Sequence, residues 1–382
     1  MLYDGYLVVA MPREPESAAH IHWMRAALFV CRPDVVGWAG TGKAWPIGGR
    51  CGTMGDMATI VVLEPRDVPL GGYRAITVRR TLPHIERTSV GPFIFADHFG
   101  PTEPAMDVAP HPHTHLATCT WLFSGRVRHD DSAGHHLDVV PGDTVLMVAG
   151  NGIAHSEYSW PDGPDLHGVQ LWLGYPTDER HADRGLHHFT TRAVTHGGVT
   201  ARVFLGGLSG EVGGEVGGVE ADFGSSPIPA PRRALAAELR MEPGAALTVP
   251  LGREVGILVD SGSAELADGP GSSAIAGPAA LAHSRGVVSE ATITAGDDGA
   301  VLILLAGDPY GEDLLMLWNF VGEDESAVRS AREDWENAET RATRFGVVEG
   351  YPGFDGEPTR AQIDRIPAPP MPSVKLRPRR NK

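Results

Sequence analysis

The sequence predicts an all-β protein, with two β-barrels in succession and a helix near the C-terminal end. Three observations support this prediction. The chain has 382 residues, which is enough for two domains of ordinary size. Its 48 glycines and 31 prolines favour frequent turns between short strands. Two long regions, 73–173 and 199–305, consist of short apolar segments between turn signals, and a helical period replaces them after residue 319.

The first 56 residues show no such pattern. Their apolar runs are brief, and the region 40–55 is rich in glycine and other small residues. A strand-like segment begins only after Met57. We therefore interpret residues 1–56 as a poorly ordered extension outside the folded core, or as the result of a start codon placed too far upstream. The pair His20-Ile21-His22 within it is interpreted as carrying no function.

Residues 57–190 are predicted to form the first barrel. Strand-like segments recur about every ten residues and are bounded by turn-forming residues. The turn signals include Asp131-Ser132-Ala133-Gly134 and Pro141-Gly142-Asp143. The predicted strands are 76–80, 92–96, 118–123, 126–130, 137–140, 144–149, 153–158 and 166–173.

Residues 195–322 are predicted to form a second barrel of similar length. Its clearest strand-like segments are 201–205, 246–249, 255–259 and 300–305. Region 206–218 holds two overlapping copies of Gly-Glu-Val-Gly-Gly and is interpreted as a flexible loop. The candidate metal ligand of this region is His283, and a single histidine does not hold a metal ion. We therefore expect the second barrel to be metal-free.

Residues 323–382 are predicted to form a helix and a tail. Val328, Ala331, Trp335 and Ala338 fall on one face of the helix, with acidic residues at its start and arginines near its end, as the helix dipole favours. Gly346 is expected to end the helix. The tail is rich in proline and then basic. We interpret it as solvated and disordered, with an anionic contact surface as the alternative.

Charge and cysteine content exclude several classes of protein. The formal net charge of −16 argues against direct nucleic-acid binding, because neutralising phosphates requires a basic surface. Cys31, Cys51 and Cys119 form no CxxC pair and fit a reducing compartment. The start of the chain does not read as a signal peptide, and no apolar stretch approaches the roughly 18 residues of a membrane span. We therefore predict a cytoplasmic protein without membrane contacts.

The candidate functional site consists of two short motifs, His111-Pro112-His113 and His155-Ser156-Glu157. Residues i and i+2 of a strand lie on the same face, so each motif directs two ligand side chains to one side of its strand. A proline is tolerated at the start of a strand, where it fixes an extended backbone. Several short strands fit between the motifs, so the two strands that carry them can meet across a small barrel.

These motifs predict one metal site, with His111, His113, His155 and Glu157 as its ligands. Three imidazoles and one carboxylate suit a divalent transition metal such as iron, manganese, nickel or copper. An octahedral ion held in this way keeps two positions for water, dioxygen or a substrate oxygen. Zinc sites are more often closed or have three protein ligands, so zinc ranks below iron.

Neighbouring residues are assigned simpler roles. His115 keeps the strand parity of His111 and His113, so we expect it to line the pocket or to hydrogen bond there, with a fifth-ligand role as the alternative. His129 is interpreted as a turn residue at a strand end, and His135-His136 as part of a solvated hairpin turn. We expect Cys119 to pack in the barrel core. The same place is expected for four aromatic residues, with a pocket wall as the alternative; they are Phe93, Phe95, Trp121 and Trp172.

An ordered series of motifs resembles the pirin family. It begins with Val90-Gly91-Pro92-Phe93 and ends with Trp318-Asn319-Phe320-Val321 and the helix through Trp335. The resemblance covers most of residues 60–350 with the expected spacing. It implies a bicupin fold, the same four metal ligands, and iron (Fe2+) as the usual metal. The intervening motifs are Asp97-His98-Phe99-Gly100-Pro101, Pro110-His111-Pro112-His113, Leu122-Phe123-Ser124-Gly125, His129-Asp130-Asp131-Ser132, Pro141-Gly142-Asp143, 149–157 and 167–172.

The resemblance also implies quercetin-type flavonol 2,3-dioxygenase activity, known for some pirins, and a non-enzymatic role in others. An enzyme of this kind would take a small phenolic or enol substrate, with Glu157 as the general base for its acidic hydroxyl. The alternative is a metal-dependent regulatory module that binds a protein partner. Departures from the family's common residues are expected to border the pocket and leave the substrate open; they are Thr114, His115, Ala117 and Asn151.

Overall fold

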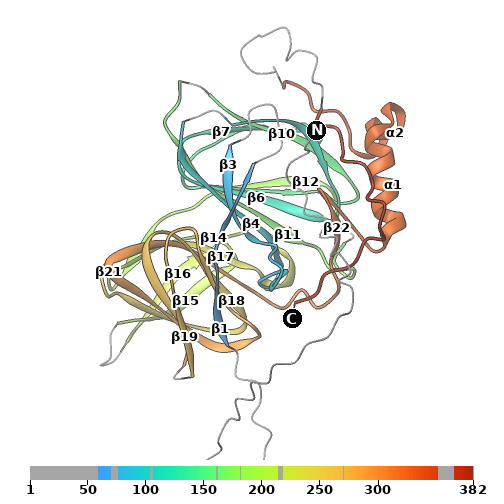
Figure 1. Cartoon of the computed structure of the whole chain (residues 1–382). Helices are drawn as coiled ribbons and strands as arrows, with labels where there is room; N and C mark the ends of the chain where they lie inside the picture. Colours follow the sequence, from blue (N-terminus) through green and yellow to red (C-terminus); the bar gives the residue numbers. More distant parts are fainter. Residues whose placement is uncertain are drawn as a thin grey trace, which may run out of the picture. The chain divides into compact units, whose positions relative to one another are not determined.

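The computed structural model describes residues 59–69, 76–103, 106–160, 162–180, 182–213, 218–269, 271–351 and 365–381. The predicted extension, residues 1–56, with its pair of histidines, lies outside this part of the chain, as do Cys31 and Cys51. The described residues form two β-barrels followed by two short helices (Figure 1). The predicted all-β fold is confirmed.

The first barrel is built from a seven-stranded sheet, in the order β12-β9-β6-β11-β4-β3-β2, and a four-stranded sheet, in the order β5-β10-β7-β8. Its strand pairs are antiparallel, and each strand predicted for this region overlaps an observed one. The strands are β2 (Arg66–Pro69), β3 (Thr77–Leu82), β4 (Phe93–Thr102), β5 (Asp107–His113), β6 (Leu116–Ser124), β7 (Val127–Asp131), β8 (His136–Val139), β9 (Asp143–Val148), β10 (Ile153–Ser159), β11 (Leu166–Gly174) and β12 (Gly185–Thr190).

Side chains along β6 alternate between two environments. Cys119 and Trp121 point out of the first barrel into a hydrophobic core that both barrels share, where Trp121 stacks on Phe204 with ring centroids 4.6 Å apart. Thr120 and Leu122 lie on the opposite face, toward the interior of the first barrel. The predicted core packing of Cys119 and Trp121 is confirmed, and burial raises the pKa of the Cys119 thiol to about 12.

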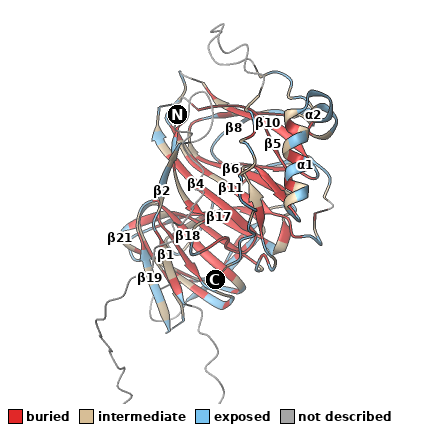
Figure 2. Ribbon diagram, turned by 45° about the vertical axis from the view of Figure 1, so that its right-hand side comes forward, coloured by how far each residue is buried: buried red, intermediate tan, exposed pale blue. Residues whose placement is uncertain are grey.

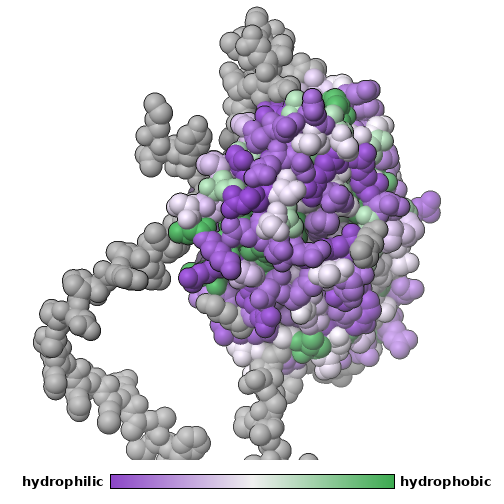
Figure 3. All heavy atoms as spheres, turned by 90° about the vertical axis from the view of Figure 1, so that its right-hand side faces the viewer, coloured by the Kyte–Doolittle hydropathy of each residue, from purple (hydrophilic) through white to green (hydrophobic). Residues whose placement is uncertain are grey.

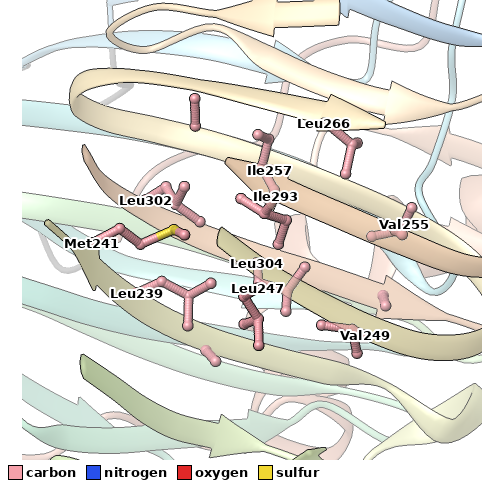
Figure 4. Packing of buried hydrophobic residues seen from close by; sticks show 14 of the residues in the cluster. Leu239, Met241, Leu247, Val249, Val255, Ile257, Leu266, Ile293, Leu302 and Leu304 are labelled. Carbon is pink, nitrogen blue, oxygen red and sulfur yellow. The ribbon is translucent and has the colours of Figure 1, made fainter. Parts of the chain in front are cut away.

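The second barrel is a ten-stranded antiparallel sheet with its own apolar interior, formed largely by leucine, isoleucine and valine (Figure 4). A 3-10 helix, η1 (Pro231–Arg233), precedes β17. The strands are β1 (Ile60–Leu63), β13 (Val194–His196), β14 (Val199–Leu205), β15 (Gly207–Val212), β16 (Val219–Ser225), β17 (Leu235–Met241), β18 (Ala246–Asp268), β19 (Ser272–Ala276), β20 (Leu281–Ser284) and β21 (Val288–Gly307).

Strand β1 joins the second barrel and not the first. It pairs with β20, with Leu63 opposite Leu281 and Val61 opposite His283. The predicted assignment of this segment to a first barrel that begins at residue 57 is therefore wrong. Its apolar pattern identifies a strand, but the partner lies more than two hundred residues away, and local pattern carries no information on such pairing.

The region interpreted as a flexible loop contains a strand. β15 pairs with β16, and its side chains Leu208 and Val212 are buried in the core of the second barrel. Gly210 between them allows a close approach, because a Cβ there would lie 2.2 Å from the carbonyl oxygen of Thr248. The glycines hid an alternating pattern in the sequence, so the loop interpretation is wrong for β15.

The two barrels pack against each other through the shared core, and the buried strands of both are visible on either side of it (Figure 2). Two buried acidic residues of the second barrel bind groups of the first. Trp121 Nε1 donates to Glu238 Oε2 at 2.8 Å. Arg87 Nη2 lies 2.7 Å from Glu254 Oε1, and both side chains are buried. Each buried carboxylate therefore has a partner in the other barrel.

The C-terminal part begins with a hairpin, β22 (Leu315–Leu317) and β23 (Phe320–Gly322), followed by α1 (Glu325–Glu336) and α2 (Ala338–Arg344). The structure has two helices where the sequence predicted one, because Asn337 is extended and its side chain caps α2. Val328, Ala331 and Trp335 share the predicted face of α1, which is buried. Ala338 does not belong to that face, because it opens the second helix, and it is exposed. 

Two residues at the ends of the helical region, Asp324 and Gly346, have the capping roles that their residue types favour. The side chain of Asp324 accepts a hydrogen bond from Ala327 N at the start of α1. Gly346 follows the last turn of α2 with a φ of +77°, a conformation that favours glycine. The predicted end of the helical region at Gly346 is confirmed.

The tail is not solvated and disordered where the structure describes it. Leu314 and Arg379 exchange two backbone hydrogen bonds of 2.8 Å. Asn381 Oδ1 accepts hydrogen bonds from the backbone of Thr88 and Ser89. Apolar side chains among the prolines, such as Ala368, pack in the cluster around Trp335. The disordered interpretation is therefore wrong for residues 365–381, because these contacts offset the cost of ordering the chain.

Within the described residues, no helix combines the length and apolarity that crossing a bilayer requires. The face that carries α1 and α2 is predominantly hydrophilic, and its apolar residues form small separate groups (Figure 3). This agrees with helices whose apolar sides are turned toward the barrel.

Candidate metal centre

The two predicted motifs lie on neighbouring strands of the four-stranded sheet. β10 pairs antiparallel with β5, and their register places His155 opposite His111. His113 lies on the same face, two residues further along β5. A shift of register between His155 and Glu157 marks a β-bulge, in which β5 has one residue more than β10. Strand pairing therefore brings the motifs side by side.

The three histidines converge on one point. One ring nitrogen of each can be chosen so that all three atoms lie within 4.8 Å of one another. His113 Nε2 lies 3.0 Å from His155 Nε2. The ring centroids of His111 and His155 are 4.3 Å apart. All three side chains are buried, so the cluster is enclosed by the barrel.

Glu157 lies at the edge of this group. Its carboxylate falls within 4.8 Å of nitrogens of His155 and His129, but it is not grouped in this way with His111 and His113. The side chain is buried, and Glu157 Oε1 accepts a hydrogen bond from the Thr120 hydroxyl at 3.1 Å. Thr120 comes from the opposite sheet, so it fixes the carboxylate across the barrel.

Burial controls the protonation of these groups. Desolvation lowers the pKa of His111 to about 4, and it lowers the pKa values of His113 and His155 well below the usual range. Neighbouring histidines contribute to the lowering of all three pKa values. Burial raises the pKa of Glu157, with opposing effects from His129 and the Thr120 hydroxyl. The histidines are therefore neutral at pH 7, the state in which imidazole binds metals.

The arrangement of nitrogens fits a metal ion. His111 Nδ1 donates to the carbonyl oxygen of Ala109 at 2.9 Å, which leaves the lone pair of this residue on Nε2. His113 Nδ1 is buried without a hydrogen-bond partner among the described residues. The two Nε2 atoms of His113 and His155 face each other, and only one proton can lie between them. A divalent cation bound to these lone pairs satisfies them together.

His129 belongs to the site, although the sequence interpretation placed it in a turn. It lies on β7, which pairs with β10 on the side away from β5, and it is opposite Glu157. Its Nδ1 is 3.4 Å from His155 Nδ1, and its Nε2 is 3.3 Å from Asp131 Oδ2. The turn interpretation is therefore wrong. The pattern Val127, His129, Asp131, with a period of two, was the available signal.

Asp131 is a buried carboxylate with several donors around it. Burial would raise its pKa, but hydrogen bonds from the His129 ring and the backbone of His135 outweigh this effect, and the pKa of Asp131 is lowered overall. His135 Nδ1 lies 3.0 Å from Asp131 Oδ2, and His136 Nδ1 lies 2.7 Å from Asp130 Oδ1. The two histidines lie in the predicted hairpin, and both rings contact carboxylates there.

His115 does not continue the inward face of β5. The strand ends at His113, and His115 has a φ of +53°, which turns the chain out of the extended conformation. Its backbone N–H donates to Gly150 O at 2.8 Å. The parity argument for His115 is therefore wrong, and none of the candidate ligand groups among the described residues includes it.

Three of the family departures contact elements other than the strands of the histidine cluster. The hydroxyl of Thr114 donates to Val321 O at 2.9 Å and so anchors β23. Ala117 packs in the core shared by the barrels. Asn151 Oδ1 and its backbone oxygen accept hydrogen bonds from Arg344 of α2. These positions support neighbouring elements, and the expectation that they border a substrate pocket stays a prediction.

Aromatic side chains form one wall beside the cluster. Phe95 and Trp172 stack with centroids 4.0 Å apart. The ring of Trp172 meets that of His113 edge-on, with centroids 5.0 Å apart. Phe95 and Trp172 also belong to a buried hydrophobic cluster and Phe93 packs in the shared core, so the predicted core packing is confirmed for all three.

A second group of candidate ligands lies between the barrels. His98 Nε2 and His167 Nε2 are each 2.6 Å from Asp260 Oδ1. Arg79 Nη2, which can only donate, lies 2.7 Å from His98 Nδ1. His98 Nε2 therefore carries a proton and has no lone pair for a metal. The sequence did not predict this group, because its members come from three distant strands; the geometry indicates a hydrogen-bond cluster that joins the barrels.

Comparison with known proteins assigns the chain to a family. The family model described as Pirin matches residues 75–173, which include all four predicted ligands, and the Pirin C-terminal cupin domain matches residues 236–341. A Pseudomonas aeruginosa protein named "Putative quercetin 2,3-dioxygenase" is 32% identical over 314 residues, covering 80% of this chain and 89% of that protein. The chain belongs to the pirin family. A "Pirin-like protein" of Caulobacter vibrioides is 31% identical over 290 residues, or 72% of this chain and 92% of that one.

The pirin assignment agrees with the fold. The solved structure of a quercetin 2,3-dioxygenase from Acinetobacter baumannii superposes with a TM-score of 0.69 and 27% identity, covering 85% of this pirin and 98% of that chain. The two barrels are thus the two cupin domains of a bicupin, as the motif series implied.

Proposed function

We propose that this pirin is a metal-dependent oxygenase of the quercetin 2,3-dioxygenase type. In this proposal His111, His113, His155 and Glu157 hold one divalent transition metal in the first barrel. The observation that carries it is the convergence of three buried, neutral histidines, two of them with Nε2 atoms 3.0 Å apart. The names of the relatives in Pseudomonas and Acinetobacter support the reaction class.

Iron (Fe2+) is the metal we propose, because three imidazoles and a carboxylate suit it and it exchanges electrons with dioxygen. When bound, such an ion supplies Lewis-acid activation of a phenolic oxygen and a redox partner for dioxygen. Manganese, nickel and copper suit the same donors. Zinc would supply the Lewis-acid activation but not the redox chemistry with dioxygen. The substrate class we propose is a small flavonol or a related enol.

The residues around the site have separable roles in this proposal. Glu157 accepts the proton of the acidic substrate hydroxyl, and Thr120 orients the carboxylate from the opposite sheet. The ring of Trp172 offers a flat apolar surface next to His113. Because the barrel buries the cluster, water is excluded from the reacting groups.

Glu157→Gln tests the role of the general base. The amide keeps the shape of the side chain but cannot take a proton, so we expect aerobic turnover of quercetin to fall about 10²- to 10⁴-fold. Oxygen uptake by iron-loaded protein is the measurement, and metal content is determined in the same samples by mass spectrometry. Glu290→Gln, at an exposed position on the second barrel, is the matched control.

Two results would decide between the enzyme and the metal-dependent regulatory module. Wild-type protein that holds metal but consumes no oxygen with any flavonol or enol would overturn the oxygenase proposal and leave a module that acts on a protein partner. Wild-type protein that holds no transition metal under any loading condition would overturn both.

A further inference from the structure

His129 and Asp131 lie on the same face of the sheet as the candidate ligands. β7 pairs with β10 on the side opposite to β5, with His155 opposite Asp131 and Glu157 opposite His129. All four side chains are buried. The central strand β10 therefore has the histidines of β5 on one flank, and an imidazole and a carboxylate on the other.

Polar atoms connect His155 to Asp131 through His129. His155 Nδ1 lies 3.4 Å from His129 Nδ1, and His129 Nε2 lies 3.3 Å from Asp131 Oδ2. The hairpin fixes Asp131 in turn, because its Oδ1 accepts hydrogen bonds from the backbone N–H groups of Ala133 (2.8 Å) and His135 (3.1 Å). The row of groups thus begins at a carboxylate whose position is set by the backbone.

The carboxylate determines which nitrogens carry protons along this row. Asp131 only accepts, so His129 Nε2 carries a proton, and with its ring proton there the lone pair of His129 is on Nδ1. His155 Nδ1 donates to that lone pair, which leaves the lone pair of His155 on Nε2. This nitrogen is the one that faces His113 Nε2 at 3.0 Å.

We infer that His129 and Asp131 are positioning residues for the metal centre. They hold His155 in the tautomer and orientation in which its Nε2 binds the ion. The inference rests on the proposed function. Ligating histidines usually donate their second N–H to a partner that raises their basicity, and loss of that partner lowers metal affinity by about 10- to 100-fold. Here an imidazole stands between the carboxylate and the ligand.

The geometry favours positioning over a direct metal bond from His129. Although its ring lies close to His155 and Glu157, both of its nitrogens face protein groups. Its Nδ1 faces the Nδ1 side of His155, whereas the lone pairs that suit a metal are on the Nε2 side. A direct bond would require His129 to release Asp131.

Asp131→Asn is the sharpest test. The asparagine oxygen keeps the two backbone hydrogen bonds of the hairpin, so its NH2 group faces His129 Nε2. His129 Nε2 then accepts from this NH2 group, and His129 Nδ1 donates to His155 Nδ1. The proton of His155 moves to Nε2, where it blocks binding of the metal. We expect zinc affinity to fall about 10- to 100-fold, measured by chelator competition with full-length protein. A carboxylate-to-amide change acts through the histidine tautomer in the Ser-His-Asp triad of proteases in the same way.

Nitrogen-15 chemical shifts of the histidines provide a readout independent of activity. In zinc-loaded wild type we expect His155 to be protonated at Nδ1 and bound to metal at Nε2, and His129 to be free of metal. In metal-free Asp131→Asn we expect the proton of His155 on Nε2. His136→Gln is the control, because it removes a histidine of the same hairpin that contacts Asp130 instead.

His129→Gln is a second variant in case Asp131→Asn fails to fold. Glutamine can donate or accept, so it imposes no tautomer, and a smaller loss of zinc affinity is expected. Unchanged affinity in both variants, with zinc still bound by the wild type, would overturn the positioning role alone. A metal-bound His129 nitrogen would also overturn it. Wild-type protein without affinity for zinc, iron or nickel would overturn the proposed function together with this inference.

Discussion

Trp121 shows how a single residue joins the two barrels. It lies on a strand of the first barrel but points out of it, stacks on Phe204 and donates to the buried carboxylate of Glu238. The same carboxylate accepts a second hydrogen bond from Arg240 Nε at 2.5 Å. The tryptophan thus supplies both apolar area and the donor that a buried acid needs.

Trp121→Phe should destabilise the protein through that lost donor. The phenyl ring can still stack on Phe204, but one oxygen of Glu238 is left buried without its partner, at a cost of about 1–3 kcal/mol in the free energy of unfolding. Urea unfolding is the measurement. The same substitution in a Glu238→Gln background should cost less, because the unpaired group is then neutral. An equal cost in both backgrounds would assign the loss to packing.

The clustering of His111, His113 and His155 could be predicted at the residue scale, whereas His129 had only a weak period-two signal. The pairs around Pro112 and Ser156 are local patterns, so strand alternation alone places both members of each on one face. His129 stands beside two aspartates in a turn-rich sequence, where polarity outweighed the period-two pattern in the interpretation. Its role depends on β7 pairing with β10, which no local pattern specifies.

At the scale of elements, β10 is the strand on which the site depends. It is paired on both sides, and its Ala154 belongs to the hydrophobic cluster that also contains Trp335 of α1. The C-terminal helices therefore support the strand that carries His155 and Glu157. This explains why a segment far along the chain belongs to the first barrel.

Trp335→Ala should weaken this support. The side chain is buried, and its Nε1 donates to Ile366 O at 2.9 Å. Truncation of a buried tryptophan costs about 3–5 kcal/mol. Trp335→Phe keeps most of the packing and should cost about 1 kcal/mol for the lost hydrogen bond. Chemical denaturation measures both, and Trp160→Ala, at a half-exposed tryptophan that stacks under Arg126, is the control expected to lose less.

Strands were easier to predict than their partners. Every strand expected in the region 76–173 was found, because short apolar segments between turns are a local property. The pairing of β1 with the second barrel, the strand β15 and the order of the tail were missed. Each depends on contacts between residues more than twenty-five positions apart or on a pattern obscured by glycine.

At the scale of the whole molecule, buried histidines make the folded state sensitive to acid. Outside the histidine cluster, burial, together with the charges of Arg87, Arg285 and His84, lowers the pKa of His283 to about 4. Burial likewise lowers the pKa of His98, with partial compensation by Asp260. His283 Nδ1 donates to Ser284 O at 2.9 Å, and its Nε2 has no hydrogen-bond partner among the described residues.

The unfolded chain therefore binds more protons than the folded protein below the ordinary histidine pKa of about 6.5. For His283, stability is full above pH 6.5 or so and is lost as the pH falls toward about 4. Between pH 7.5 and pH 5 we expect this residue to account for a loss of about 2 kcal/mol in the free energy of unfolding. Urea unfolding of metal-free protein across this range is the measurement. His283→Gln should flatten the profile, whereas His187→Gln, at an exposed position on β12, should leave it unchanged. Equal slopes for wild type and His283→Gln would show that the acid sensitivity lies in the other buried histidines.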